Sequence, residues 1–121
     1  MTRIFAGAIA LVALALLLAP ARAQLGVGTV VNNGSIAITS TFQQVLAGNG
    51  TRKGCTIQNQ GTHVMYVYPG VASAATTGAS LMLQPGQVFL CQSTGSSVIT
   101  DPISMTGTAG DAWVANEQRV P

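Results

Sequence analysis

Few side chains in this 121-residue chain could carry out acid–base chemistry. His63 is the only histidine, and the carboxylates are Asp101, Asp111 and Glu117. Two carboxylates that met in space could hydrolyse a glycosidic bond, but nothing in the sequence indicates such a pair. We expect His63 to be an exposed residue beside a turn, and the two aspartates to begin turns. Because motifs for a serine nucleophile, zinc-binding histidines and a phosphate-binding loop are absent from the sequence, we predict a non-enzyme without metal or cofactor.

The two cysteines, Cys55 and Cys91, both lie in segments with a strand pattern. In an exported protein they can oxidise, and a disulfide between them would close a loop of about 36 residues. The alternative is two buried free thiols, because cysteine packs well as a small apolar side chain. We expect the disulfide. A redox site would typically need a Cys-x-x-Cys motif and a zinc site would need further ligands nearby, and the sequence offers neither.

Residues 1–23 have the layout of an export signal. Arg3 precedes an apolar run over residues 4–19, and Ala21-Arg22-Ala23 forms a small-x-small cleavage site. The run is shorter than the roughly 20 residues that a membrane-spanning helix needs, so we predict a signal peptide cleaved after Ala23. The protein is then expected in the periplasm, outside the cell or in a virion, with no membrane anchor after cleavage.

The 98 residues after the predicted cleavage site carry no net charge. Their basic residues are Arg52, Lys53 and Arg119, and their acidic residues are Asp101, Asp111 and Glu117. Three basic residues cannot form the patch that binding to nucleic acid or to an anionic membrane requires, so we expect neither partner. Weak self-repulsion instead favours association with other protein surfaces.

Short segments of alternating apolar and polar residues, separated by turn signals, follow the leader. Residues 52–70 predict a central hairpin, with two strands joined by the polar turn Asn59-Gln60-Gly61-Thr62. Further strands are expected to begin at Thr29 and to cover residues 35–41, 42–46, 81–83, 87–92, 98–100, 103–106 and 112–117. Residues 32–35 predict a turn, Pro85-Gly86 predicts a type II turn, and one helical turn is the alternative for residues 42–47.

This pattern predicts an all-β protein. We expect a single antiparallel β-sandwich, jelly-roll-like or immunoglobulin-like, of about seven to nine short strands. The expected division is a signal peptide over residues 1–23, a flexible leader and first strand over residues 24–34, and the sandwich over residues 35–121.

Two tyrosines and a loop of small residues provide a candidate binding surface. Tyr66 and Tyr68 share one face of the predicted hairpin, and Thr76 and Thr77 lie in the predicted surface loop over residues 71–80. If exposed, these side chains could recognise a glycan or a protein. The alternatives are that the tyrosines pack against a neighbouring strand or subunit and that the loop is a plain connector.

Four motifs together resemble a known family. RKGCTIQNQG at residues 52–61, VMYV at 64–67, ATTG at 75–78 and LQPGQ at 83–87 are similar to small β-sandwich proteins of bacteriophages and prophages, which are virion structural or accessory proteins. The resemblance spans residue 49 to about Trp113 and offers no catalytic residues. It implies that Arg52 and Ile57-Gln58-Asn59 hold the central hairpin in place. The signal peptide departs from the family, because virion proteins of tailed phages normally assemble in the cytoplasm.

We therefore expect an exported, non-enzymatic structural or assembly protein, such as a phage-related virion component. Its partners would be copies of itself or other assembly proteins. The alternative is a periplasmic or secreted module that binds a glycan or a protein through Tyr66, Tyr68, Thr76 and Thr77.

Overall fold

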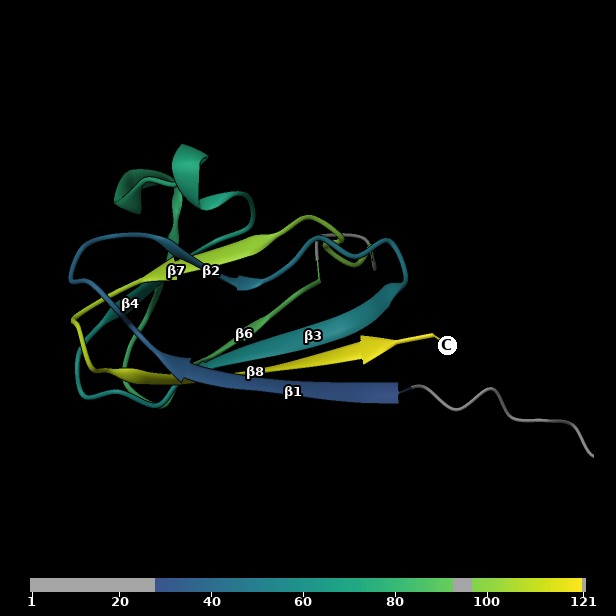
Figure 1. Ribbon diagram of the computed structural model, residues 1–121, viewed down its shortest axis with the longest axis horizontal. Helices are drawn as coiled ribbons and strands as arrows, with labels where there is room; N and C mark the ends of the chain where they lie inside the picture. The colour runs from purple at the N-terminus through teal and green to yellow at the C-terminus, as the bar shows by residue number, and fades with distance from the viewer. Residues whose placement is uncertain (1–27, 93–96, 121) are drawn as a thin grey trace, which may run out of the picture.

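A computed structural model describes residues 28–92 and 97–120 (Figure 1). The described strands are β1 (Gly28–Ser35), β2 (Gln43–Leu46), β3 (Arg52–Asn59), β4 (Met65–Tyr68), β5 (Leu81–Leu83), β6 (Val88–Leu90), β7 (Ile103–Thr106) and β8 (Ala112–Arg119). Two short 3-10 helices, η2 (Ala72–Ala74) and η3 (Thr77–Ala79), lie between β4 and β5. The predicted signal peptide over residues 1–23 lies outside the described residues.

The strands form two antiparallel sheets packed face to face, which confirms the predicted single β-sandwich. Sheet A has the order β1-β8-β3-β6, and sheet B has the order β2-β7-β4-β5. The first four strands pair with the last four in reverse order: β1 with β8, β2 with β7, β3 with β6 and β4 with β5. This pattern is a long antiparallel hairpin rolled into two layers, which is the jelly-roll topology.

The predicted central hairpin is wrong, because β3 and β4 lie in different sheets. β3 pairs with β6 and β8, and β4 pairs with β5 and β7. Residues 60–64 therefore carry the chain from one sheet to the other (Figure 1). Alternating side chains on either side of a polar turn fit a hairpin and an inter-sheet link equally well, so the local pattern could not distinguish them.

The N-terminal prediction is also wrong in two places. The predicted turn over residues 32–35 is the second half of β1, which pairs with β8 without interruption. The predicted strand over residues 35–41 is a series of bends and turns, in which Ile36 is buried and Ile38 is 62% exposed. Gly34 serves close packing here, because a Cβ at this position would lie 2.7 Å from the Trp113 ring.

The other predicted strands have mixed outcomes. Residues 42–46 contain β2 and no helical turn, while residues 98–100 contribute only an isolated bridge between Gln92 and Val98. Gly86 has a φ of +82°, as the predicted type II turn requires.

The core lies between the sheets and is built by residues that alternate along the strands. On β3, Cys55, Ile57 and Asn59 are buried, while the residues between them are partly exposed. The buried apolar residues are Ile36, Val45, Leu46, Cys55, Ile57, Met65, Val67, Leu83, Phe89, Cys91, Ile103, Met105, Trp113 and Ala115.

The predicted disulfide between Cys55 and Cys91 is present. It joins β3 to the residue after β6, across a Cα–Cα distance of 5.0 Å, where the Cys91 N–H also donates to the Cys55 carbonyl at 2.9 Å. A structural disulfide of this kind suggests an oxidising, non-cytoplasmic environment. Among the described residues, no helix is both long and apolar enough to cross a bilayer.

Replacing both cysteines by serine should lower the free energy of unfolding by about 3–4 kcal/mol, because the bridge restricts a 36-residue loop in the unfolded chain. Urea titrations of the wild type and of the double variant would measure this loss. Adding a reductant provides the control, since it should lower the stability of the wild type and leave the stability of the double variant unchanged. Equal unfolding midpoints for the oxidised wild type and the variant would contradict the prediction.

Candidate functional site

A cluster of charged residues fills one end of the sandwich. The Arg52 side chain, at the start of β3, is fully buried and donates from Nε to Glu117 Oε1 at 2.7 Å. Arg119 is 41% exposed and donates to the other oxygen, Oε2, from Nε at 2.8 Å and from Nη2. Asn49 Nδ2 also donates to Oε1, at 3.2 Å. Each buried charged group of this cluster is therefore in contact with a group of opposite charge.

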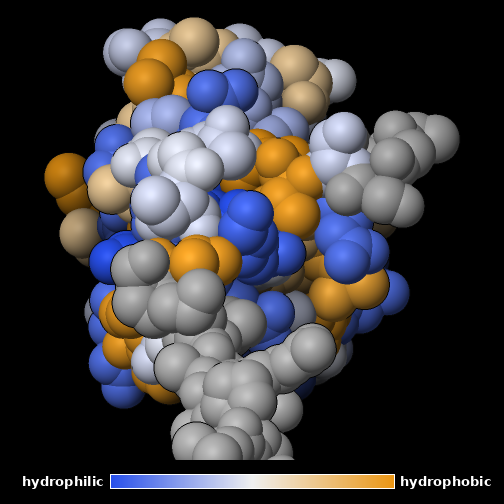
Figure 2. Space-filling view, turned by 90° about the vertical axis from the view of Figure 1, so that its right-hand side faces the viewer, coloured by the Kyte–Doolittle hydropathy of each residue, from blue (hydrophilic) through white to orange (hydrophobic). Residues whose placement is uncertain are grey.

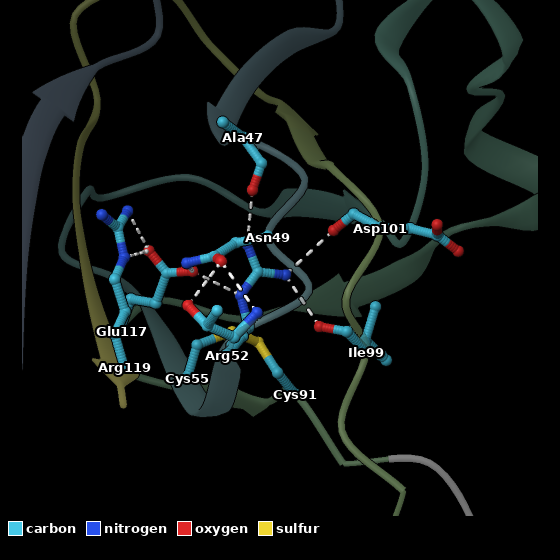
Figure 3. A network of polar contacts seen from close by, with 10 residues as sticks. Ala47, Asn49, Arg52, Cys55, Cys91, Ile99, Asp101, Glu117 and Arg119 are labelled. Carbon is cyan, nitrogen blue, oxygen red and sulfur yellow. Dashed lines mark hydrogen bonds and ion pairs between the residues drawn. A yellow bond between two sulfur atoms is a disulfide. The ribbon is translucent and has the colours of Figure 1, made fainter. Parts of the chain in front are cut away.

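Arg52 also holds the links between the sheets (Figure 3). Its Nη1 donates to the carbonyl of Ile99 at 2.7 Å and to that of Asp101 at 2.9 Å, and its Nη2 donates to the carbonyl of Ala47. Ala47 lies in the link from β2 to β3, and the other two residues precede β7. The fixed fork of the guanidinium thus joins both links to the strand that carries it.

Seen from this end, the sandwich shows hydrophilic residues next to hydrophobic ones (Figure 2). Most of the cluster lies below this surface, because Arg52 and Glu117 are almost completely buried and only Arg119 reaches solvent. The cluster therefore has the burial of a structural ion pair rather than that of an open catalytic site.

Glu117 remains ionised in these surroundings. Burial alone would raise the pKa of its carboxyl group, but hydrogen bonds from Arg52 and Arg119 and the charge of Arg52 outweigh that effect. The net result is a pKa below the ordinary value of 4.5. The folded protein therefore prefers the charged carboxylate more strongly than the unfolded chain does.

Asn59 plays the corresponding role at the opposite end of β3. Its side chain is fully buried, and its Nδ2 donates to the carbonyls of His63 at 2.8 Å and Leu83 at 3.0 Å. Its Oδ1 accepts the N–H of Gly61 at 2.9 Å. One amide thus ties the link from β3 to β4 to the end of β5, which keeps buried backbone groups paired.

His63 and Asp111 lie together at this same end. His63 Nδ1 is 3.0 Å from Asp111 Oδ2, although the imidazole side chain is 60% exposed. Burial would raise the pKa of Asp111, but the Thr62 N–H and His63 outweigh it and lower that pKa. Gly61 must remain small, because a Cβ there would lie 2.5 Å from the Asp111 side chain.

The pair does not form a nucleophile–histidine–aspartate triad. The Thr62 hydroxyl lies 3.2 Å from His63 Nδ1, which is the same nitrogen that faces Asp111. In a triad the nucleophile and the aspartate are on opposite nitrogens, so this geometry does not activate Thr62. Among the described residues, no three metal-ligating side chains form a group that could hold a metal ion.

The predicted binding residues lie on the outer face of sheet B. Tyr66 and Tyr68 are half-buried there, and Thr76 and Thr77 are exposed in the loop between β4 and β5. A Cβ on Gly70 would lie 2.5 Å from the Tyr68 ring, so this tyrosine packs against its own loop. The Gly70 carbonyl in turn accepts a 2.8 Å hydrogen bond from Ser104. The loop thus folds back over part of the surface that the tyrosines could offer.

The outer face of sheet A is unusual in its lack of charge. Apart from Lys53 at the bulge of β3, its strands direct uncharged side chains outward. Three of these are large apolar residues, with Val31 62%, Val88 48% and Leu90 57% exposed. A hollow of about 240 Å³ on this face is lined by Thr29, Gly54, Cys55, Thr56, Leu90, Gln92, Asn116 and Gln118. The face can exclude water without desolvating charges.

Sequence reasoning did not identify the Arg52–Glu117 pair. A usable signal exists, because Glu117 is in phase with Trp113 and Ala115 along the last predicted strand, which indicates a core-facing carboxylate that needs a cation. Asn59 is likewise in phase with Cys55. The contact between His63 and Asp111 has no comparable signal, because 48 positions separate them.

Comparisons of the chain with protein-family models, with curated proteins and with solved structures found no match. The resemblance to phage virion proteins therefore stays a prediction.

Replacing Arg52 by methionine should lower the free energy of unfolding by about 3–5 kcal/mol, because the Glu117 carboxylate loses its buried partner. Arg119→Met is the matched control, since it touches the same carboxylate from a partly exposed position and should cost about 1 kcal/mol. Trp113 fluorescence during urea unfolding would measure both. Equal losses in the two variants would contradict a central role for Arg52.

Stability should fall in acid because of Glu117. The unfolded chain takes up a proton near pH 4.5, whereas the folded protein holds the carboxylate to lower pH. Between these two pKa values the unfolded state binds more protons, so the stabilisation is complete above pH 4.5 and is lost as pH falls through the folded pKa.

Urea midpoints from about pH 6 to about pH 3 would measure this dependence. Glu117→Gln should be less stable than the wild type near neutral pH and should lose less stability in acid. Asp111 titrates in both proteins and so cancels in the comparison. Parallel acid profiles for the two proteins would exclude Glu117 as a source of the effect.

Proposed function

We propose that this chain is an exported, non-enzymatic structural protein that works by associating with copies of itself or with other proteins of an assembly. In its most specific form, the proposal is a phage-related virion component. The resemblance of residues 49 to about 113 to small virion proteins led to this proposal, and the properties of sheet A support it independently.

The outer face of sheet A carries the argument. Protein interfaces are depleted in charged residues at their centres, and apart from Lys53 near the start of β3 this face has hydroxyl, amide and apolar side chains across its four strands. Val31, Val88 and Leu90 are large apolar residues that remain about half or more exposed in the isolated chain. Covering them against another protein would remove apolar surface from water without burying unpaired charge.

Two further observations agree with this role. Jelly rolls recur in viral capsid and lectin domains, which is an analogy at the level of fold and carries no information about a site. The disulfide between Cys55 and Cys91 suits a module that must persist in an oxidising environment.

The second candidate function is a secreted or periplasmic module that binds a glycan or a protein. The hollow on sheet A favours this function, because its lining combines apolar surface with a few hydroxyl and amide groups, the mixture by which pockets hold and orient a neutral polar ligand. The surface predicted from Tyr66, Tyr68, Thr76 and Thr77 is less favourable, because the loop after β4 packs against Tyr68.

A density gradient of periplasmic and extracellular fractions, with this protein located by mass spectrometry, tests the proposal. We expect it to migrate with dense particles or large assemblies, because its uncharged face would be covered by neighbouring proteins. A soluble control protein of similar mass from the same fractions marks the top of the gradient. Recovery of the chain only with that control would overturn the assembly function and favour the binding module.

A further inference from the structure

We propose that strand β1 pairs antiparallel with β1 of a second copy, so that sheet A continues across a two-fold axis. This inference rests on the proposed assembly function and names one contact through which it would operate. The occupant of the β1 edge is thus a second copy of this chain rather than an unrelated partner.

The four edge strands of the two sheets differ in how well they are protected. β5 and β6 have three residues each, and β2 has four residues with a break in register between Gln44 and Leu46. β1 has eight residues, pairs with β8 without a bulge, and contains no charged residue and no proline. Proteins usually protect sheet edges by shortness, bulges, charges or proline. β1 alone among these edges lacks all four.

The free edge of β1 carries backbone N–H and C=O groups that do not face β8. Every other residue of an edge strand turns its N–H and C=O away from the neighbouring strand. Within the part of the chain that the structure describes, the one such group of β1 with a further partner is the Ser35 carbonyl, which accepts from Gln43 Nε2 at 2.9 Å. The outward-turned backbone groups within residues 28–34 are therefore available for the main-chain bonds by which strands add to sheets.

The register follows from symmetry. A two-fold axis perpendicular to the sheet would place each residue opposite a residue on the same face. One residue would then face its own copy across the axis. Centring on Val31 pairs residues 28–34, places Thr29 opposite Asn33, and leaves out Ser35, whose carbonyl is already bonded. Centring on Asn32 would instead require Ser35. Val31 is 62% exposed, and this register covers it with its own copy.

Charge does not oppose the pairing. The residues after the predicted cleavage site have no net charge, and the side chains that would meet are threonine, valine and asparagine. Like charges directly opposite each other would destabilise a strand pair, and none are present. Val31 opposite its own copy is a pair of β-branched residues, a type that is enriched in strands.

Disulfide capture tests the register directly. In the full chain recovered from the exported fraction, Val31→Cys should give a covalent dimer under mild oxidation, since opposite residues in antiparallel strands lie about 4.5–5.5 Å apart between Cα atoms, within disulfide range. Asn33→Cys is the control, because its copies would lie four positions apart along the strand, or roughly 13 Å. Equal capture at both positions, or capture at neither, would overturn the proposed register.

Sedimentation of the protein in solution tests pairing through β1 without introducing a cysteine. The wild type should sediment as a dimer, and Val31→Lys should weaken dimerisation at least about tenfold because two lysines would face each other. Ile38→Lys makes the same kind of change at an equally exposed site outside sheet A and should leave the dimer intact. A wild-type monomer, or a Val31→Lys dimer as stable as the wild type, would overturn pairing through β1.

The outcomes separate this inference from the proposed function. Migration with particles but no Val31→Cys capture would overturn β1 pairing and leave the assembly function standing. Capture of Val31→Cys by a chain that stays at the top of the gradient would support the pairing and overturn the assembly function, and the protein would then be a secreted dimer.

Discussion

The buried ion pair between Arg52 and Glu117 is the contact on which the two-layer arrangement most depends. Every link between consecutive strands except the one from β4 to β5 crosses from one sheet to the other, and the backbone of such links cannot join a ladder. Arg52 supplies donors to two links at one end, and Asn59 supplies an amide at the other end. β3 therefore fixes both ends of the sandwich, and the apolar core between them can pack in one arrangement.

The use of charged residues inside the fold explains why the outer surface carries few charges. Arg52, Glu117, Arg119 and Asp111 all take part in contacts within the chain, and few other charged residues are present. Apart from Lys53, the outer face of sheet A is left with hydroxyl, amide and apolar groups. Asp111 and Glu117, two of the carboxylates considered for catalysis, are thus held in contacts within the chain, and the face that we propose for association carries few charges. That division is one ground on which we propose an assembly role.

Much of the fold could be predicted because alternation of side chains is a local property. The segments around Cys55, Met65 and Phe89 predict strands from a few neighbouring residues, and the disulfide is expected from the predicted export and the strand placement of both cysteines. Pairing between strands is not local. The polar residues 59–62 look alike in a hairpin and in an inter-sheet link, and residues 32–35 have turn chemistry that pairing with β8 overrides. The contact between His63 and Asp111 depends on this pairing and could not be inferred earlier.

The pairing of the first strand with the last has a consequence for when the protein can fold. β1 pairs with β8, whose residues end at Arg119, so a chain that emerges N-terminus first cannot complete sheet A until β8 has emerged. Contacts this distant in sequence form slowly, because the loop entropy is lost before the contacts form. The topology that closes the sandwich therefore leaves the nascent chain without its native strand pairs until β8 is available, which suits the export that we propose.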